Sequence, residues 1–289
     1  MTKTTDQAVL DDWYAIATAS ELTAKPVRTK LLGQDIDYCL GEGRAPIVRE
    51  ILDDGSHGLP LPVQVRYGCL FTTLGTPRKD IVHIEEAGES DRRFVPCGWV
   101  TMRASGLRVV ENFLDMAHFP FVHTDILGSE PHTEVPHYLS EIRRDVDEVW
   151  ATNCTFFQPR IAATEDKGDF VHLTYRVPSP FVVMLYRVCP TSPNRLDAIA
   201  LFIQPMEEGL CRAQPVMYLV DNISPHKALL NFEQVIFLQD RIIVENQRPL
   251  LLPLEPRAEI PTRADSSSIA YRRWLKEKGV RFGTTAGAF

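Results

Sequence analysis

The chain has 289 residues, of which 44% are hydrophobic and 24% charged, and its formal net charge is −7. This is the composition of an ordinary globular protein, long enough to bury one large core or two moderate ones. The negative charge argues against a nucleic-acid-binding protein, which normally presents a basic face. The polar N-terminus and the lack of any long apolar stretch argue against a secretion signal and a membrane span, so we expect a cytoplasmic protein.

The six cysteines are scattered singly along the chain. Without a signal peptide, this distribution predicts free thiols in a reducing compartment. None has a His within two positions and no two are close together, so we expect no locally encoded zinc or iron–sulfur site. The cysteines are Cys39, Cys69, Cys97, Cys154, Cys189 and Cys211.

The first ninety residues read as short strands separated by turns. Residues 13–17 are an apolar strand candidate, and residues 27–40 alternate around a Leu32-Gly33-Gln34-Asp35 turn, which predicts a β-hairpin. Strand character returns over residues 63–73, with Tyr67-Gly68 as a turn or bulge. We therefore expect a small β-rich unit at this end of the chain.

A second organisation begins near Phe94. Residues 99–103 predict a strand, and residues 107–116 predict a helix that Pro120 ends or kinks. Apolar segments then alternate with turns at a spacing that predicts an antiparallel meander in one large sheet. The expected strands are residues 148–157, 170–177, 181–189, 197–204 and 211–220.

Two helices are expected near the C-terminus. The longest helical pattern covers residues 226–246 and stops before Pro249, and a last helix covers residues 266–278 and closes on Gly279. The fold class that follows is α+β. Residues 1–92 would form the small β-rich part, and residues 93–289 a larger sheet covered by helices.

The first helix of the larger part carries chemistry-bearing side chains. Asp115 and His118 are three residues apart and would share one face of the helix. His123 follows five residues after His118, and Pro120 between them would let the chain fold back so that both imidazoles aim at one point. Asn112 lies one turn before Asp115 on the same face.

Two histidines alone make an incomplete metal site. Catalytic iron(II) that binds dioxygen needs two imidazoles and one carboxylate on one face, with open positions opposite. Asp240 lies in an otherwise apolar helix, where a buried acid is costly unless it is paired or bound to metal, so it is the expected third ligand, with Glu245 as the alternative. On spacing alone, His118 could equally be a core histidine, His123 a surface residue and Asp240 a solvated one.

This segment resembles the mononuclear iron motif of Rieske non-heme iron oxygenase α subunits, Asn-x-x-Asp-x-x-His-x-x-x-x-His. Residues 237–247 are similar to the helix that brings the family's ligand Asp, and the match falls on Asp240. Residues 13–17 and 61–71 resemble the opening of the family's Rieske domain and the strand pair after its cluster. The resemblance implies a trimmed Rieske-like β remnant over residues 1–92, followed by a helix-grip catalytic domain whose antiparallel sheet covers a long helix.

The chain departs from the family at the cluster itself. The family binds a [2Fe–2S] cluster with a Cys-x-His and a Cys-x-x-His pair, and neither pair occurs between Cys39 and Leu61. The resemblance therefore implies no cluster in this chain and a Rieske-cluster-containing reductase, using NAD(P)H, as electron donor. A related oxygenase subunit or an accessory protein is a further expected partner, in a trimer-based homo- or hetero-oligomer.

Within the family, the chain resembles the Rieske-lacking N7-demethylase subunits of bacterial methylxanthine (caffeine) degradation. The similar stretches are residues 111–128, 263–265 and 271–280. This resemblance implies oxidative N-demethylation of a 7-methylxanthine-like substrate with O2 and release of formaldehyde.

The same resemblance implies a role for each site residue. His118, His123 and Asp240 would bind one Fe(II). Asp115 would hydrogen-bond a metal histidine and connect it to the donor's cluster, and Asn112 would line the site near the iron.

Three alternatives stay open. One is O-demethylation or hydroxylation of another aromatic substrate, because fold and metal site do not specify the substrate. The others are a non-catalytic structural subunit of an oxygenase assembly and a carrier of apolar ligands. Metal content separates these last two from an enzyme, because neither needs two histidines and a carboxylate at one point.

Overall fold

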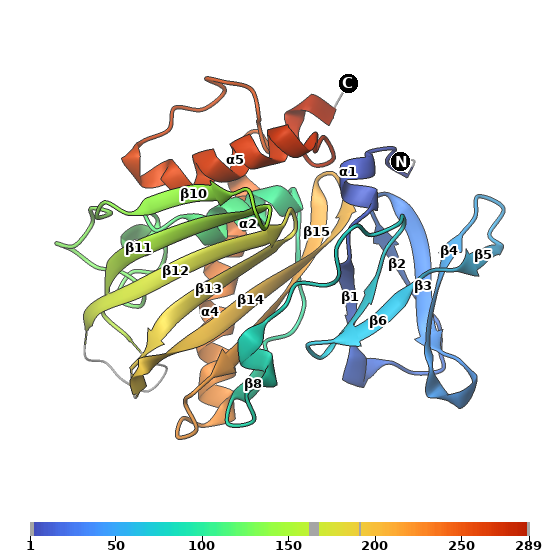
Figure 1. Cartoon of the computed structure of the whole chain (residues 1–289), viewed down its shortest axis with the longest axis horizontal. Helices are drawn as coiled ribbons and strands as arrows, with labels where there is room; N and C mark the ends of the chain where they lie inside the picture. Colours follow the sequence, from blue (N-terminus) through green and yellow to red (C-terminus); the bar gives the residue numbers. More distant parts are fainter. Residues whose placement is uncertain (1–2, 162–167, 191, 288–289) are drawn as a thin grey trace.

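The structure is a computed structural model that describes residues 3–161, 168–190 and 192–287. It is a mixture of antiparallel sheets and helices, as the α+β expectation requires (Figure 1). In the part of the chain that is described, no helix is both long enough and apolar enough to cross a membrane.

The larger part is built on an eight-stranded antiparallel sheet. Its path is β10–β11–β12–β13–β14–β15–β8, and β9 also pairs with β15. The consecutive order from β10 to β15 confirms the predicted meander. The strands are β8 (Arg93–Pro96), β9 (Val100–Met102), β10 (Leu139–Arg143), β11 (Glu148–Gln158), β12 (Asp169–Ser179), β13 (Val182–Cys189), β14 (Ser192–Glu207) and β15 (Leu210–Leu219).

The N-terminal part forms two smaller antiparallel sheets, with orders β1–β7–β6 and β2–β3–β4–β5. The predicted hairpin is confirmed, because β2 pairs with β3 around Leu32 and Gly33, whose φ values of 51° and 84° are typical of a tight hairpin turn. The short helix α1 (Gln7–Leu10) precedes them. The strands are β1 (Tyr14–Thr18), β2 (Val27–Leu31), β3 (Gln34–Leu40), β4 (Pro46–Ile51), β5 (His57–Pro60), β6 (Val63–Arg66) and β7 (Cys69–Thr72).

Helix α4 (His226–Asn246) crosses behind the large sheet, and α5 (Ser266–Lys278) lies along its β10 edge (Figure 1). Both helices have the predicted bounds. Leu229, Phe237 and Val244 of α4 are buried against the sheet and form one stripe of the helix. Gly279 ends α5 with φ of 75°, the left-handed conformation that favours glycine at this position.

The helix before the histidines ends earlier than expected. Helix α2 (Gly106–Leu114) stops at Leu114, and Asp115 follows as an extended residue with ψ of 128°. The Asp115 carboxylate accepts a hydrogen bond from the Ala117 backbone N–H at 2.8 Å, a turn that competes with helix continuation. The expectation that Asp115 and His118 share one helix face is therefore wrong.

Pro120 also acts differently from the prediction. A second short helix, α3 (Phe119–Val122), begins directly after His118, and Pro120 lies in its first turn. A proline is well tolerated there, because its missing N–H has no partner in the helix and its φ is already helical. Pro120 therefore starts a helix, and the break before it is made by Asp115.

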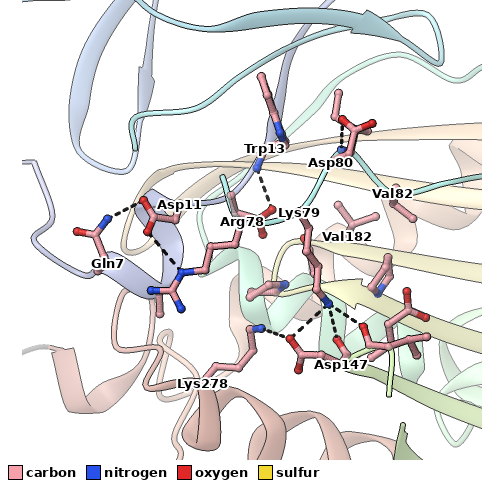
Figure 2. Close-up of a pocket in the computed structure, with 18 of the residues that line it drawn as sticks. Gln7, Asp11, Trp13, Arg78, Lys79, Asp80, Val82, Asp147, Val182 and Lys278 are labelled. Atoms are coloured by element: carbon pink, nitrogen blue, oxygen red, sulfur yellow. Dashed lines mark hydrogen bonds and ion pairs between the residues drawn. The ribbon is translucent and has the colours of Figure 1, made fainter. Parts of the chain in front are cut away.

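A wide cleft of about 950 Å³ lies between the N-terminal part, chiefly α1 and the loop of residues 78–83, and the turn between β10 and β11 with the end of α5 (Figure 2). Lys79 of the N-terminal part donates to the Val146 carbonyl at 2.7 Å, and its ammonium group lies 3.4 Å from the Asp147 carboxylate. Lys278 of α5 reaches the same carboxylate at 2.7 Å. The charged groups along this wall thus tie the two parts of the chain together.

Candidate metal centre

The break between α2 and α3 brings the two histidines to one side of the chain. His118 is the N-cap of α3 and His123 its C-cap, so one short helical turn separates them. The turn is closed by hydrogen bonds from the Val122 N–H to the His118 carbonyl at 2.8 Å and from the His123 N–H to the Phe119 carbonyl at 3.0 Å. As a result, the two Nε2 atoms lie 3.1 Å apart.

Asp240 of α4 supplies a carboxylate to the same point. Its Oδ1 lies 3.0 Å from His123 Nε2 and 3.3 Å from His118 Nε2. Two ligand atoms at about 2.1 Å from one metal ion and at right angles to each other lie about 3 Å apart, so all three separations fit one triangular face around an ion. Among the described residues, these three are also the one group of His, Cys, Asp or Glu with metal-ligand spacing.

The hydrogen bonds behind the imidazoles decide which nitrogen faces inward with a lone pair. His118 Nδ1 lies 2.9 Å from Asp115 Oδ2, and His123 Nδ1 lies 2.8 Å from Gln239 Oε1. Because both oxygens are acceptors, each Nδ1 can donate its proton to its partner, which leaves each Nε2 free to present a lone pair to a cation at the centre. Two lone pairs and a carboxylate oxygen converging at this distance are suited to a metal cation.

The electrostatics of the cluster also favour positive charge. Burial lowers the pKa of His118, but its hydrogen bonds to Asp115 and Asp240 outweigh burial and raise that pKa to about 9. Burial raises the pKa of Asp240, but hydrogen bonds from His118 and His123 hold it below its usual value. The cluster therefore stabilises a cation at its centre.

Beside the centre, between α4 and the large sheet, lies a largely apolar cavity of about 70 Å³. Its polar lining includes Gln158, Arg187 and Glu233, and burial raises the pKa of Glu233 to about 7. Binding sites for drug-sized ligands measure about 300–1,000 Å³, so lining side chains must move apart to admit such a ligand. The apolar lining includes Leu173, Leu185, Ile199, Phe232, Ile236 and Phe237.

Five residues named from the sequence come together at this centre. Asn112, Asp115, His118, His123 and Asp240 form one connected set, in which the Asn112 amide donates to Asp240 Oδ1 at 3.3 Å.

The structure places the alternative ligand Glu245 elsewhere. Its Oε1 accepts from the Arg103 backbone N–H at 3.0 Å and from Arg241 Nε at 3.1 Å. Sequence reasoning missed Gln239 and Gln158, because nothing in a helical or strand pattern distinguishes an amide that faces a histidine or a cavity from one that faces solvent.

Comparison with known proteins places these features in context. Residues 102–281 match the model of the vanillate O-demethylase oxygenase C-terminal domain. The chain is 44% identical over 280 residues to a protein of Pseudomonas sp. (strain TJI-51) named "Probable methylxanthine N7-demethylase NdmC", covering 96% of this chain and 98% of that protein.

Solved structures share the fold. The structure "Pseudomonas putida CBB5 NdmA with caffeine" superposes with a TM-score of 0.75 at 18% identity, covering 94% of this chain and 92% of that one. Dicamba monooxygenase bound to 3,6-dichlorosalicylic acid superposes with a TM-score of 0.69 at 13% identity, covering 94% and 98%. At these identities the likeness concerns the fold.

Proposed function

This chain belongs to the Rieske-type non-heme iron oxygenase family, and we propose that it is the catalytic subunit of a multicomponent N-demethylase that acts on a methylxanthine. The observation that carries the proposal is the convergence of His118, His123 and Asp240 within 3.3 Å of one another beside a largely apolar cavity. Similarity over nearly the whole chain to a probable methylxanthine N7-demethylase supports the substrate class.

In this proposal, His118, His123 and Asp240 hold one iron(II) ion. Iron(II) held by two imidazoles and one carboxylate on one face supplies dioxygen activation to this class of enzyme. Asp115 and Gln239 accept the Nδ1 protons and so keep both imidazoles turned toward the centre.

Two more features prepare the site for a planar heterocyclic substrate. The Asn112 amide holds Asp240 Oδ1 in place through its 3.3 Å hydrogen bond. The apolar side chains from the sheet and from α4 exclude water around the reacting methyl group, which strengthens every electrostatic interaction inside the cavity.

The proposed reaction replaces an N-methyl group by N–H. One oxygen atom of O2 enters a methyl C–H bond, and the other leaves as water with two electrons and two protons. The resulting N-hydroxymethyl group breaks its C–N bond and departs as formaldehyde, while the ring nitrogen takes up the proton.

The two electrons must come from outside the chain. We assign residues 1–92 to a Rieske-like β remnant and residues 93–289 to the catalytic domain, and the remnant contains no Cys-x-His or Cys-x-x-His pair. A Rieske-cluster-containing reductase that oxidises NAD(P)H is the proposed donor. The Asp115 side chain is 26% exposed and contacts His118, so it offers a path from the surface to the centre.

Reconstitution tests this proposal. The chain loaded with iron(II) is mixed with a Rieske-bearing reductase, NAD(P)H, O2 and 7-methylxanthine. We expect one formaldehyde per xanthine formed, and no turnover when the reductase or its Rieske domain is omitted. Formaldehyde release from methoxyaromatic compounds, with none from any methylxanthine, would overturn the substrate assignment.

A further inference from the structure

The cavity beside the candidate metal centre has one end where hydrogen-bonding groups are incompletely used. Gln158 is only 3% exposed, and its Oε1 accepts no hydrogen bond from any residue that the structure describes. A buried acceptor without a donor costs about 1–3 kcal/mol. Each such atom needs an explanation, and for an atom that lines a ligand cavity one explanation is a hydrogen bond made by the ligand.

Arg187 lines the same cavity and offers the complementary group. Its Nη2 donates to the Ile161 carbonyl at 3.0 Å, three residues after Gln158. Its Nε lies 3.7 Å from Asp197 Oδ2, an ion-pair distance that is too long for a hydrogen bond. Its buried Nε–H donates to no acceptor within the described part of the chain. The lining of this cavity therefore holds an unused acceptor in Gln158 and an unused donor in Arg187, together with the Tyr175 hydroxyl, which also has no partner among the described residues.

Strand geometry places Gln158 beyond the metal centre. Phe156, two residues earlier on the inward face of β11, contacts Phe119 ring to ring at 5.4 Å, and Phe119 contacts the His118 imidazole at 5.0 Å. Two residues of strand add about 7 Å. Gln158 thus lies at the next inward position of β11 past the aromatic group that packs on the histidines.

On the α4 side, the polar end of the cavity also lies several ångströms away from the metal centre. Glu233 lines the cavity from α4, and Arg187 acts on it electrostatically. Glu233 precedes Asp240 by seven residues, which corresponds to about 10 Å along the helix axis. The apolar residues Ile236 and Phe237 lie between them.

We propose that Gln158 and Arg187 read the pyrimidinedione ring of the substrate, with Gln158 Oε1 accepting a ring N–H and Arg187 Nε donating to a ring carbonyl. This inference rests on the proposed function and names the selectivity of the same site. A ligand oriented in this way directs its other ring, with the N7 methyl group, toward the metal centre.

The pairing predicts a choice between methylxanthines. 7-Methylxanthine keeps ring N–H groups that can donate to Gln158. Caffeine has methyl groups on all of these nitrogens, so binding it would bury the Gln158 acceptor unpaired. A site built to bind an N–H discriminates strongly against an analogue that lacks it.

Isothermal titration calorimetry of the full chain with 7-methylxanthine and with caffeine tests the inference in wild type, Gln158→Leu and Arg187→Lys. We expect wild type to prefer 7-methylxanthine by at least about tenfold, and Gln158→Leu to lose most of that preference. With the reductase present, Gln158→Leu should raise KM for 7-methylxanthine about 10- to 100-fold and change kcat little, because the groups at the metal centre are untouched. Arg187→Lys keeps the charge opposite Asp197 and should weaken both ligands alike, since both retain the carbonyls.

Gln214→Leu is the matched control. Gln214 is 1% exposed and its Oε1 also has no described partner, but it does not line this cavity, so its substitution should leave the preference unchanged. If wild type turns over 7-methylxanthine and Gln158→Leu keeps both its affinity and its preference, the inference is wrong while the proposed function stands. If wild type neither binds nor demethylates any methylxanthine, the proposed function fails and the inference fails with it.

Discussion

At the scale of single residues, the candidate centre depends on which groups stand behind the metal-facing atoms. Asp115 and Gln239 play the same part toward His118 and His123, since each accepts an Nδ1 proton at 2.9 and 2.8 Å. They differ in environment and charge. Asp115 is a partly exposed carboxylate at the end of α2, whereas Gln239 is a neutral amide within α4.

This difference separates an orienting role from an electron-transfer role. We expect Asp115→Ala and Gln239→Ala each to weaken iron(II) binding by about 10- to 100-fold, because each frees one imidazole to rotate. At saturating iron, Asp115→Ala should also slow reoxidation of the reduced Rieske partner, whereas Gln239→Ala should not. Stopped-flow spectroscopy measures this reoxidation rate. Equal reoxidation rates in the two variants would show that Asp115 only orients His118 and takes no part in electron transfer.

Glu233 gives a pH-dependent prediction. Burial raises the pKa of its carboxyl group from 4.5 to about 7, so the folded chain keeps a proton that the unfolded chain has already lost in this range. The contribution of Glu233 to stability is therefore greatest below the unfolded pKa and is lost as the pH rises through about 7.

The Gln side chain of the Glu233→Gln variant cannot ionise, so this variant does not lose stability as the pH rises through this range. In chain stripped of metal by a chelator, the unfolding free energy of Glu233→Gln relative to wild type should rise on the order of 3 kcal/mol from about pH 5 to about pH 8. Denaturant unfolding at each pH measures it. A difference that stays constant with pH would show that Glu233 is ionised throughout.

The residue types of the metal centre could be predicted from the sequence, but part of their geometry could not. A histidine pair with an acid three residues before it, and an isolated acid in an apolar helix, are visible without coordinates. The turn that Asp115 makes with the Ala117 N–H is a local competition between side chain and helix, which spacing does not reveal. Gln239 was missed because its partner, His123, is 116 residues away in the chain.

At the scale of secondary-structure elements, the predicted bounds were correct where a proline or glycine that stops a helix flanks a clear helical pattern of apolar residues. Helix α4 follows Pro225 and stops before Pro249, and α5 ends at Gly279, so their bounds could be read directly. Strands β4, β5 and β10 were not predicted. Their burial alternates weakly, because each has exposed or half-buried residues on both faces.

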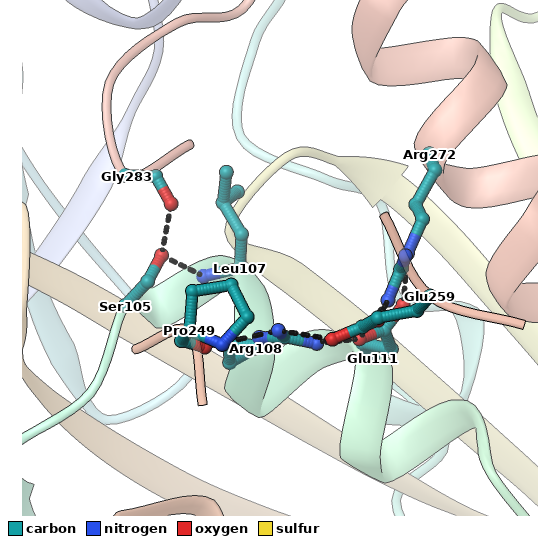
Figure 3. Close-up of polar contacts among 8 residues, drawn as sticks. All are labelled: Ser105, Leu107, Arg108, Glu111, Pro249, Glu259, Arg272 and Gly283. Carbon is teal, nitrogen blue, oxygen red and sulfur yellow. Dashed lines mark hydrogen bonds and ion pairs between the residues drawn. The ribbon is translucent and has the colours of Figure 1, made fainter. Parts of the chain in front are cut away.

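Helix α2, which directly precedes the segment with the two candidate histidines, is held by a buried ionic network (Figure 3). Arg108 of α2 is 2% exposed and binds Glu111 at 3.0 Å, Glu259 at 2.6 Å and the Pro249 carbonyl at 3.0 Å. Arg272 of α5 binds the same two glutamates. The network therefore joins α2, the segment after α4, and α5 just before the chain reaches Asp115.

Arg108→Met tests the contribution of this network to stability. The substitution keeps much of the apolar stem but leaves Glu111 with one fewer cation, so we expect a loss of roughly 3–5 kcal/mol of unfolding free energy. Arg273→Met on α5 is the control, because its pair with Glu277 is exposed and screened by solvent, so its loss should change the unfolding free energy little. Similar losses in the two variants would mean that the buried network adds nothing beyond a surface ion pair.

At the scale of the whole molecule, the chain combines a candidate centre for dioxygen chemistry with an N-terminal part that lacks the Cys-x-His and Cys-x-x-His pairs of a Rieske cluster. The large sheet and α4 position the centre. The N-terminal strands form two sheets of their own, and Lys79 of this part and Lys278 of α5 both reach the Asp147 carboxylate. The overall α+β architecture and the meander order could be predicted, because both follow from local apolar patterns along the chain.

The arrangement of the two parts could not be predicted in the same way. It depends on long-range contacts such as Gln204 of β14, which donates to Thr29 Oγ1 at 2.9 Å and to the Lys30 carbonyl. Gln204 therefore holds β2 against the large sheet, and it is absent from the lining of the metal-side cavity.

Anaerobic iron(II) titration, with bound iron counted after equilibrium dialysis, tests the central claim most directly. The account predicts about one iron per chain in wild type, and none at the same free iron concentration in His118→Ala, His123→Ala and Asp240→Ala, with Glu245→Ala unchanged because Glu245 binds Arg103 and Arg241 instead. Undiminished iron in any of the three ligand variants would contradict it.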